Sequence, residues 1–207
     1  MIDLHMHSLL SDGELLPSEL ARRYEERGFE TIAITDHVDP ANIKTVVSSI
    51  VEFCCSWPKD RIKVIPGIEL THLALEQFKP ACEFARNKGI KIIVAHGETL
   101  VEPVLKGTNL AALKADIDIL AHPGLISVEE VKLAAKKGVL LEISARKGHC
   151  LGNGHVVRLA LKYGAELCIN SDAHSPSDIP TLLSLKNVGL GAGIAAGDVS
   201  KLYSYLN

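Results

Sequence analysis

Residues 2–13 read I-D-L-H-M-H-S-L-L-S-D-G, a short apolar strand that runs into two histidines one residue apart. Because side chains alternate along a strand, His5 and His7 are expected to point to the same side of the backbone. Imidazole is the commonest protein ligand for zinc and neighbouring transition metals, so this pair supplies half of a metal site. The same pattern also occurs by chance on exposed edges, and the interpretation depends on matching ligands elsewhere in the chain.

The rest of the chain alternates short β-branched runs with amphipathic segments, which is the pattern of a parallel α/β protein. Seven strands are predicted, at 2–5, 31–35, 63–65, 91–95, 117–121, 139–143 and 166–170. Helices are predicted at about 17–28, 43–55, 75–88, 128–136 and 156–163, with a short one before residue 117 and a helical closing segment at 179–207. No linker interrupts this alternation, so one domain over residues 1–207 is expected.

The composition limits the classes of function. The chain has 207 residues, of which 47% are hydrophobic and 23% charged, as in a compact globule with a sizeable core. A net charge of −3 gives no broad attraction for nucleic acid, so a long nucleic-acid substrate is disfavoured. No apolar run is long enough to span a membrane, and the five cysteines show no C-x-x-C spacing, so a reducing cytoplasmic location is expected.

Chemistry-bearing residues follow almost every predicted strand. In a parallel barrel the carboxyl ends of all strands lie on one rim, so residues distant in sequence converge there. His72, His149 and His155 lie outside this pattern, and a surface or capping role is expected for them at least as much as a functional one. The strand-end residues are His5 and His7, His37, Glu69, His96, His122, Arg146 and Lys147, and Asp172 and His174.

These motifs resemble those of the PHP family, named for polymerase and histidinol phosphatase. The matching pieces, in family order, are D-L-H-M-H-S-L-L-S-D-G at 3–13, I-T-D-H at 34–37, P-G-I-E at 66–69, A-H-G-E at 95–98, A-H-P-G at 121–124 and N-S-D-A-H at 170–174. The resemblance implies a distorted (β/α)7 TIM-like barrel with a trinuclear metal centre at the carboxyl ends of its strands. It specifies the family and the metal site far better than it specifies the substrate.

The resemblance also implies how nine ligands would divide among three divalent ions. The first ion would be held by His5, His7, Glu69 and Asp172, and the second by Glu69, His96 and His122. The third would be held by Asp12, His37 and His174; some family members have His in place of Asp12. The carboxylate at that position favours harder ions somewhat, and Zn, Mn and Fe all remain open as the metal.

Three divalent ions held by three carboxylates leave a cluster with a charge of about +3, which would attract a phosphate ester and lower the pKa of a bridging water. Arg146 and Lys147, with His149 close by, are the candidates for binding substrate phosphate. His174, His37 and Asp172 are the candidate catalytic residues, and either histidine would serve as general acid if its metal were absent or weakly bound.

The function predicted from these observations is metal-dependent hydrolysis of a small-molecule phosphate ester, such as histidinol phosphate or a nucleotide, by a metal-bridging hydroxide. Two alternatives stay open at this point. One is a nuclease or phosphodiesterase that acts on short oligonucleotides, and the other is a catalytically inert, metal-stabilised binding module. Asp36, beside His37, is expected to orient an imidazole ligand, and Glu98 to orient a ligand or contact substrate. The sequence leaves the oligomeric state open.

Overall fold

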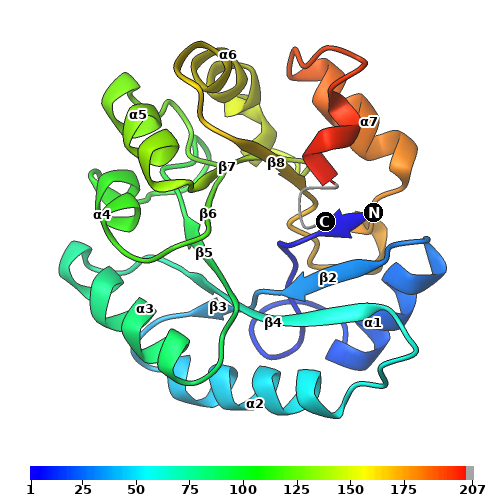
Figure 1. The fold of residues 1–207 in the computed structure, drawn as a ribbon. Coiled ribbons are helices and arrows are strands. Elements are labelled where there is room, and N and C mark those ends of the chain that lie inside the picture. Colours follow the sequence, from blue (N-terminus) through cyan, green and yellow to red (C-terminus); the bar gives the residue numbers. More distant parts are fainter. Residues whose placement is uncertain (204–207) are drawn as a thin grey trace.

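The computed structural model describes residues 1–203, and its strands form a ring that helices surround (Figure 1). Along the ring the strands follow the order β1-β2-β4-β5-β6-β7-β8, and neighbouring strands are parallel. The strands are β1 Ile2–Asp3, β2 Thr31–Ile34, β3 His37–Val38, β4 Lys63–Leu70, β5 Ile92–His96, β6 Ile119–Ala121, β7 Leu140–Ser144 and β8 Leu167–Asn170. This is the distorted, TIM-like α/β barrel that the sequence predicts.

The helices alternate with the strands and cover the outside of the ring (Figure 1). The α-helices are α1 Pro17–Glu26, α2 Ile43–Ser56, α3 Phe78–Asn87, α4 Thr108–Lys114, α5 Val128–Lys137, α6 Asn153–Tyr163 and α7 Leu182–Gly191. Short 3-10 turns are η1 Leu75–Gln77, η2 His149–Gly152, η3 Pro176–Asp178 and η4 Val199–Tyr203. Within residues 1–203 no helix has both the length and the apolar character that a membrane crossing requires.

Three details depart from the sequence-based expectation. The strand β4 continues past residue 65 through Pro66 and Gly67, because Gly67 lets the backbone pass so close to β2 and β5 that a Cβ atom would contact Thr35. The two-residue strand β3 was not predicted, and it pairs His37 with Glu69. The closing segment is helical only in pieces, with irregular chain around α7 and before η4, and residues 204–207 lie outside the described structure.

Apolar packing occurs in two layers. A large cluster lies between the strands and the helices and includes fully buried side chains such as Tyr24, Phe78 and Ile93. A smaller cluster contains Ile2, Leu4, Ala33, Ile92, Val94, Ile119, Ala121 and Cys168, all contributed by or next to strands of the ring. With apolar side chains at both layers, polar groups gather where the strands end, as in other barrels of this kind.

The ring closes between β1 and β8 through few backbone hydrogen bonds. Met6 and Ala173 form an isolated parallel bridge, and the Asp172 N–H donates to the His5 carbonyl at 2.9 Å. Side chains replace the missing ladder, because the Leu4 N–H donates to Asn170 Oδ1 at 2.9 Å.

A buried carboxylate, Asp3, forms the centre of a second set of closing contacts. Its Oδ1 accepts from the Ser171 N–H at 3.2 Å, and its Oδ2 accepts from the Tyr24 hydroxyl at 3.2 Å. The Tyr24 hydroxyl also lies 2.7 Å from Ser171 Oγ. Asp3 is fully buried, and burial raises its pKa to about 6 although hydrogen bonds from Ser171 and the backbone of His5 oppose the rise.

Replacing Asp3 by Asn should weaken the pH dependence of stability. Between about pH 4 and pH 6 the folded protein keeps a proton on Asp3 that the unfolded chain has lost, so the free energy of unfolding falls as the pH rises through this range. The rise from 3.8 to about 6 corresponds to roughly 3 kcal/mol. Urea unfolding of metal-free wild type and Asp3→Asn at pH 4.5 and pH 7.5 measures the difference. Parallel pH profiles for the two proteins would contradict the role assigned to this carboxyl.

Candidate metal centre

The strand ends surround a cavity of about 460 Å³, a volume suited to a small molecule. It lies on the carboxyl-terminal side of the strands, where the sequence places the chemistry-bearing residues. The cavity is lined by Ser11, Asp12, His37, Asn42, Thr71, His72, His96, Glu102, His122, Arg146, His149, Asp172 and His174. Of the nine predicted ligands, His5, His7 and Glu69 lie deeper still and are fully buried.

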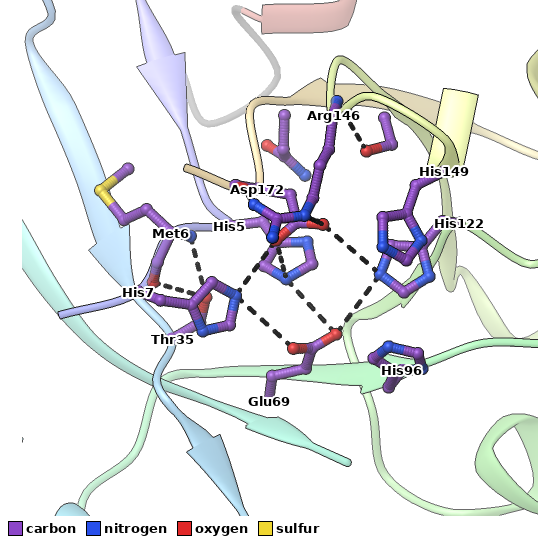
Figure 2. Close-up of polar contacts among 12 residues, drawn as sticks. His5, Met6, His7, Thr35, Glu69, His96, His122, Arg146, His149 and Asp172 are labelled. Atoms are coloured by element: carbon purple, nitrogen blue, oxygen red, sulfur yellow. Dashed lines mark hydrogen bonds and ion pairs between the residues drawn. The ribbon is translucent and has the colours of Figure 1, made fainter. Parts of the chain in front are cut away.

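The carboxylate of Glu69 lies among four imidazoles at the base of the site, and Figure 2 shows those of His5, His7 and His122. Glu69 Oε1 is 3.3 Å from His5 Nε2 and 3.6 Å from His122 Nε2. Glu69 Oε2 is 3.6 Å from His7 Nε2 and only 2.7 Å from His37 Nδ1. Opposite it, Asp172 Oδ1 lies 3.3 Å from His7 Nε2 and 3.8 Å from His5 Nε2. These donor atoms converge from the segment after β1, from β4 and from the loops after β6 and β8.

Several of these buried polar atoms have no hydrogen-bond partner within the described residues. They include His5 Nε2, both ring nitrogens of His7 and both Glu69 oxygens. A buried polar atom without a partner costs on the order of 1–3 kcal/mol, so such a group of atoms needs an explanation. Two ligands about 2.1 Å from a zinc ion at the tetrahedral angle lie about 3.4 Å apart, which is the range of separations seen here. The donor set therefore fits a metal ion.

A second group of donors comprises Asp12, His37, His174 and His7. Asp12 Oδ1 lies 3.4 Å from His174 Nε2 and 3.7 Å from His37 Nε2. The ring of His7 stacks between those of His37 and His174, with centroids 4.1 Å from each. The four donor atoms lie within 4.8 Å of one another, so the predicted third ligand set is brought together, with His7 beside it.

The loop that carries Asp12 is held by Asp36, which has a different contact from the one expected. Asp36 accepts hydrogen bonds from the Ser8 N–H, the Ser8 hydroxyl and the Ser11 hydroxyl, each at 2.7 Å. It therefore positions the loop after β1 rather than an imidazole ring. Gly13 ends this loop, and a side chain there would overlap the His7 carbonyl, so a glycine is required by the close approach of the two segments.

His96 lies beside one of its two expected partners, His122, with the ring centroids 4.4 Å apart, but no ion pair joins it to Glu69 within the described residues. Its Nε2 is 3.0 Å from Glu102 Oε2, and its donor atom groups with those of Glu102 and His72. The hydrogen bond from His96, together with the charges of the neighbouring histidines, lowers the pKa of Glu102 to about 2. Sequence reasoning missed Glu102, which lies in a loop without periodic pattern.

Glu142 on β7 is a second residue that the sequence reasoning missed. It is fully buried, and its Oε1 lies 2.8 Å from His5 Nδ1 and accepts from Asn170 Nδ2 at 2.9 Å. Its Oε2 accepts from the His122 N–H at 3.2 Å. A carboxylate on the Nδ1 side of a histidine fixes the tautomer that leaves Nε2 free for a metal. The signal was available, since Glu142 interrupts the apolar run of residues 139–143.

Glu98 has a structural role in the loop that follows β5. Its Oε1 accepts from the backbone N–H groups of Gly107 and Asn109 at 2.9 and 3.0 Å. The observed contacts of the Glu98 carboxylate are therefore with the backbone of its own loop, where they tie the two ends of residues 98–107 together, and not with His96.

Strained backbone conformations occur at the site. Among residues 1–203, the non-glycine residues with positive φ are His72 at 51°, His122 at 29° and Asp172 at 54°. Such conformations cost of order 1–3 kcal/mol and persist where the surroundings require them. All three side chains line the cavity, so the backbone strain coincides with the functional site.

Burial and neighbouring rings keep two of the imidazoles neutral. Burial lowers the pKa of His7 well below its usual value, and the adjacent ring of His37 lowers it further. Burial has the same effect on His122, where His96 is the main neighbouring ring. Neutral imidazole is the form that binds a metal, so these residues are ready to act as ligands near neutral pH.

Neighbouring carboxylates have the opposite effect on the pKa of His5. Burial opposes a charge on His5, but the carboxylates of Glu142, Glu69 and Asp172 outweigh it and raise the pKa of His5 well above its usual value. Burial also raises the pKa of Asp172 to about 7, although His5 opposes the rise. Burial opposes the charge of Glu69 too, but the rings of His5 and His37 outweigh it and lower the pKa of Glu69 well below its usual value. Asp172 is thus the carboxylate that lacks enough positive charge nearby, and a divalent cation would supply it.

The predicted substrate-binding residues lie in different places. The side chain of Arg146 lines the cavity beside Asp172 (Figure 2). Its Nη1 donates to the Asp172 carbonyl at 3.0 Å and to His174 Nδ1 at 2.7 Å. His149 also lines the cavity, with its Nδ1 2.8 Å from Thr99 Oγ1. Lys147 is exposed and lines a separate hollow that also includes Arg27 and Asp178.

Comparison with known proteins agrees with this geometry. The PHP domain family model matches residues 3–179. An uncharacterized protein of Methanocaldococcus jannaschii is 41% identical over 197 residues, which cover 93% of this chain and 89% of that protein. A protein of Thermoanaerobacter sp. strain X514 named a probable phosphatase is 25% identical over 240 residues, which cover 100% of this chain and 94% of that protein.

Solved structures share the fold at low sequence identity. A Listeria monocytogenes protein described as a candidate histidinol phosphatase has a TM-score of 0.64 and 14% identity, and the match covers 89% of this chain and 99% of that one. A chain in the structure of archaeal ribonuclease P with mature tRNA has a TM-score of 0.69 and 19% identity, with 99% of this chain and 88% of that one covered. The motifs, the barrel and the matched family model together place this chain in the PHP domain family, as a metal-dependent phosphoesterase and hence a hydrolase.

Proposed function

We propose that this protein is a phosphomonoesterase that hydrolyses a small-molecule phosphate ester, such as histidinol phosphate or a nucleotide. The observation that supports this most is the set of buried donor atoms without partners at the base of the cavity, on His5, His7 and Glu69. The cavity above them, of about 460 Å³, has room for a phosphate and a small leaving group. The similarity to proteins named as phosphatases supports the same reaction.

The proposed metal content is three divalent ions, with Zn, Mn and Fe as candidates. Bound ions of this kind supply an activated hydroxide and neutralise the charge on the phosphoryl oxygens. The proposed ligands are the nine predicted from the sequence: His5, His7, Asp12, His37, Glu69, His96, His122, Asp172 and His174. Imidazole and carboxylate donors together suit these three metals.

The protein's own groups position the substrate and the protons. Arg146 presents a guanidinium at the cavity, and its remaining N–H groups suit the oxygens of a phosphate. Arginine only donates, so the shorter contact of His174 Nδ1, that with Arg146 at 2.7 Å, puts the proton of a neutral His174 ring on Nε2, and the 3.1 Å contact of Nδ1 with the Asp172 carbonyl is then not a hydrogen bond. That atom faces Asp12, as does His37 Nε2. Either histidine would therefore be a general acid only while the Asp12 site holds no ion.

A second candidate reaction is nuclease or phosphodiesterase action on short oligonucleotides. An Escherichia coli protein named a 5'-3' exoribonuclease is 30% identical over 124 residues, which cover 53% of this chain and 42% of that protein. The small cavity and the net charge of −3 favour a mononucleotide or smaller ester over a long strand. Parallel assays with a labelled dinucleotide and a mononucleotide separate the two reactions.

Substituting His5 or Asp172 should abolish catalysis. We expect wild type to release phosphate from p-nitrophenyl phosphate with added Mn²⁺ or Zn²⁺, and His5→Ala and Asp172→Ala to be inactive because each removes a buried metal ligand. The control is His155→Ala, since His155 hydrogen-bonds to the Ile126 carbonyl and does not line the cavity. If fully metallated wild type hydrolyses no phosphate ester in a broad panel, the proposed activity is contradicted and the result favours a catalytically inert, metal-stabilised binding module.

Glu142→Gln should lower metal affinity while preserving the fold. Glutamine keeps the size of the side chain but removes the charge that faces His5 Nδ1. Loss of such a supporting carboxylate typically costs about 10- to 100-fold in metal affinity. Competition with a chromophoric chelator measures the affinity, and circular dichroism checks the fold. Unchanged affinity in a folded Glu142→Gln protein would show that the carboxylate is not needed to orient His5.

Arg146→Ala should reduce kcat/KM more than Lys147→Ala does. A charge-assisted hydrogen bond to phosphate is worth roughly 1.5–3 kcal/mol, which corresponds to about 10- to 160-fold in kcat/KM. Arg146 lines the cavity whereas Lys147 is exposed beside it, so the two adjacent cations form a matched pair. Steady-state kinetics with one aryl phosphate measure both variants. Equal losses would restore Lys147 as a partner in phosphate binding.

A further inference from the structure

The loop of residues 97–107 carries one carboxylate, that of Glu102, into the mouth of the cavity. Glu102 Oε2 is 3.0 Å from His96 Nε2 and 3.7 Å from His72 Nε2. Its other oxygen, Oε1, is 3.3 Å from His149 Nε2. Three imidazoles therefore turn their Nε2 atoms toward one side chain, which is an arrangement that a metal-binding site would use.

The orientation of the His96 ring is consistent with metal binding by this cluster. His96 Nδ1 lies 3.2 Å from the Gly97 carbonyl oxygen, an acceptor, so this contact needs the proton on Nδ1. Nε2, the atom that faces Glu102, donates to that carboxylate only when the ring carries a second proton, and a bound divalent ion would take the place of that proton. His96 lies near Glu69 in Figure 2, yet no ion pair joins the two residues there. His96, which no ion pair joins to Glu69 within the described residues, thus has a loop carboxylate as its neighbour.

His72 and His149 hold the carboxylate from two further sides. His72 has a positive φ of 51°, a conformation that costs energy in a residue other than glycine, and its ring lies 5.2 Å from that of His96. His149 is fixed through Nδ1 by Thr99, a residue of the same loop as Glu102. Two segments far apart in sequence, around 72 and 149, therefore converge on the loop.

We propose that Glu102 and His72 are additional ligands of the divalent ion that His96 binds. The donor atoms of His72, His96 and Glu102 lie within 4.8 Å of one another. Two imidazoles with one carboxylate form a set that zinc, manganese and iron all accept. This proposal rests on the metal binding put forward under the proposed function, and it adds two ligands that lie outside the strand-end pattern. It also ties residues 97–107 to the metal centre.

The test measures metal binding rather than catalysis. Zn²⁺ affinity and stoichiometry are determined by chelator competition and by elemental analysis after dialysis, for wild type, Glu102→Gln and His72→Gln. We expect Glu102→Gln to lose one ion or to bind its weakest ion at least tenfold less tightly, and His72→Gln to show a smaller loss. Glu76→Gln, a change at an exposed glutamate outside the cavity, is expected to match wild type.

Two further measurements read the ligand set directly. In Co²⁺-loaded protein, the visible spectrum of Glu102→Gln should differ from that of wild type, because the bands respond to the ligands of the ion. Trypsin cleavage after the exposed Lys106 should be slowed by Zn²⁺ in wild type but not in Glu102→Gln, since only the wild-type loop is tied to the ion. Glu102→Asp, which keeps a carboxylate, should retain part of both effects.

The outcomes separate this inference from the proposed function. If wild type binds Zn²⁺ and Glu102→Gln binds the same number of ions with the same affinity and Co²⁺ spectrum, Glu102 is not a ligand and only this inference is overturned. If wild type binds no divalent ion, the proposed function and this inference both fall.

Discussion

The carboxylate of Glu69 is the group around which the rest of the site is arranged. It is fully buried, and the imidazoles of His5, His7, His37 and His122 surround it, with His37 Nδ1 the nearest at 2.7 Å. A carboxylate in such a place is costly unless positive charge is close by. The unusual passage of β4 through Pro66 and Gly67 is explained by this residue, because the strand must continue to deliver Glu69 to the centre of the ring.

Much of this arrangement follows from the sequence. The strand-end histidines and acids could be predicted because periodicity locates each strand and a parallel barrel brings the carboxyl ends together. The strand β3 could not, because two residues carry no periodic signal. Glu102 could not either, since its position depends on the path of an irregular loop. Glu142 was within reach, because a lone acid in an apolar strand needs a buried partner.

Asp36 and Glu98 contact groups other than the predicted ligands beside them in the sequence. Both acids lie beside predicted ligands in the sequence, and both were expected to act on those neighbours. In the structure each binds backbone N–H groups of a nearby loop instead, Asp36 at Ser8 and Glu98 at Gly107 and Asn109. Backbone amides at loop ends need acceptors, and a carboxylate at the end of a strand is the nearest one. Proximity in sequence therefore indicated the right region but the wrong partner.

The sparse join between β1 and β8 has a consequence for how the molecule holds together. His5 and His7 come from one side of this join and Asp172 from the other, so an ion bound among them would link the first strand to the last. Metal binding would then close the barrel between its first and last strands. Backbone amide hydrogens at the join between β1 and β8 would therefore exchange with solvent at a rate that depends on metal occupancy. Those in the hydrogen-bonded strand pairs of the rest of the barrel would not.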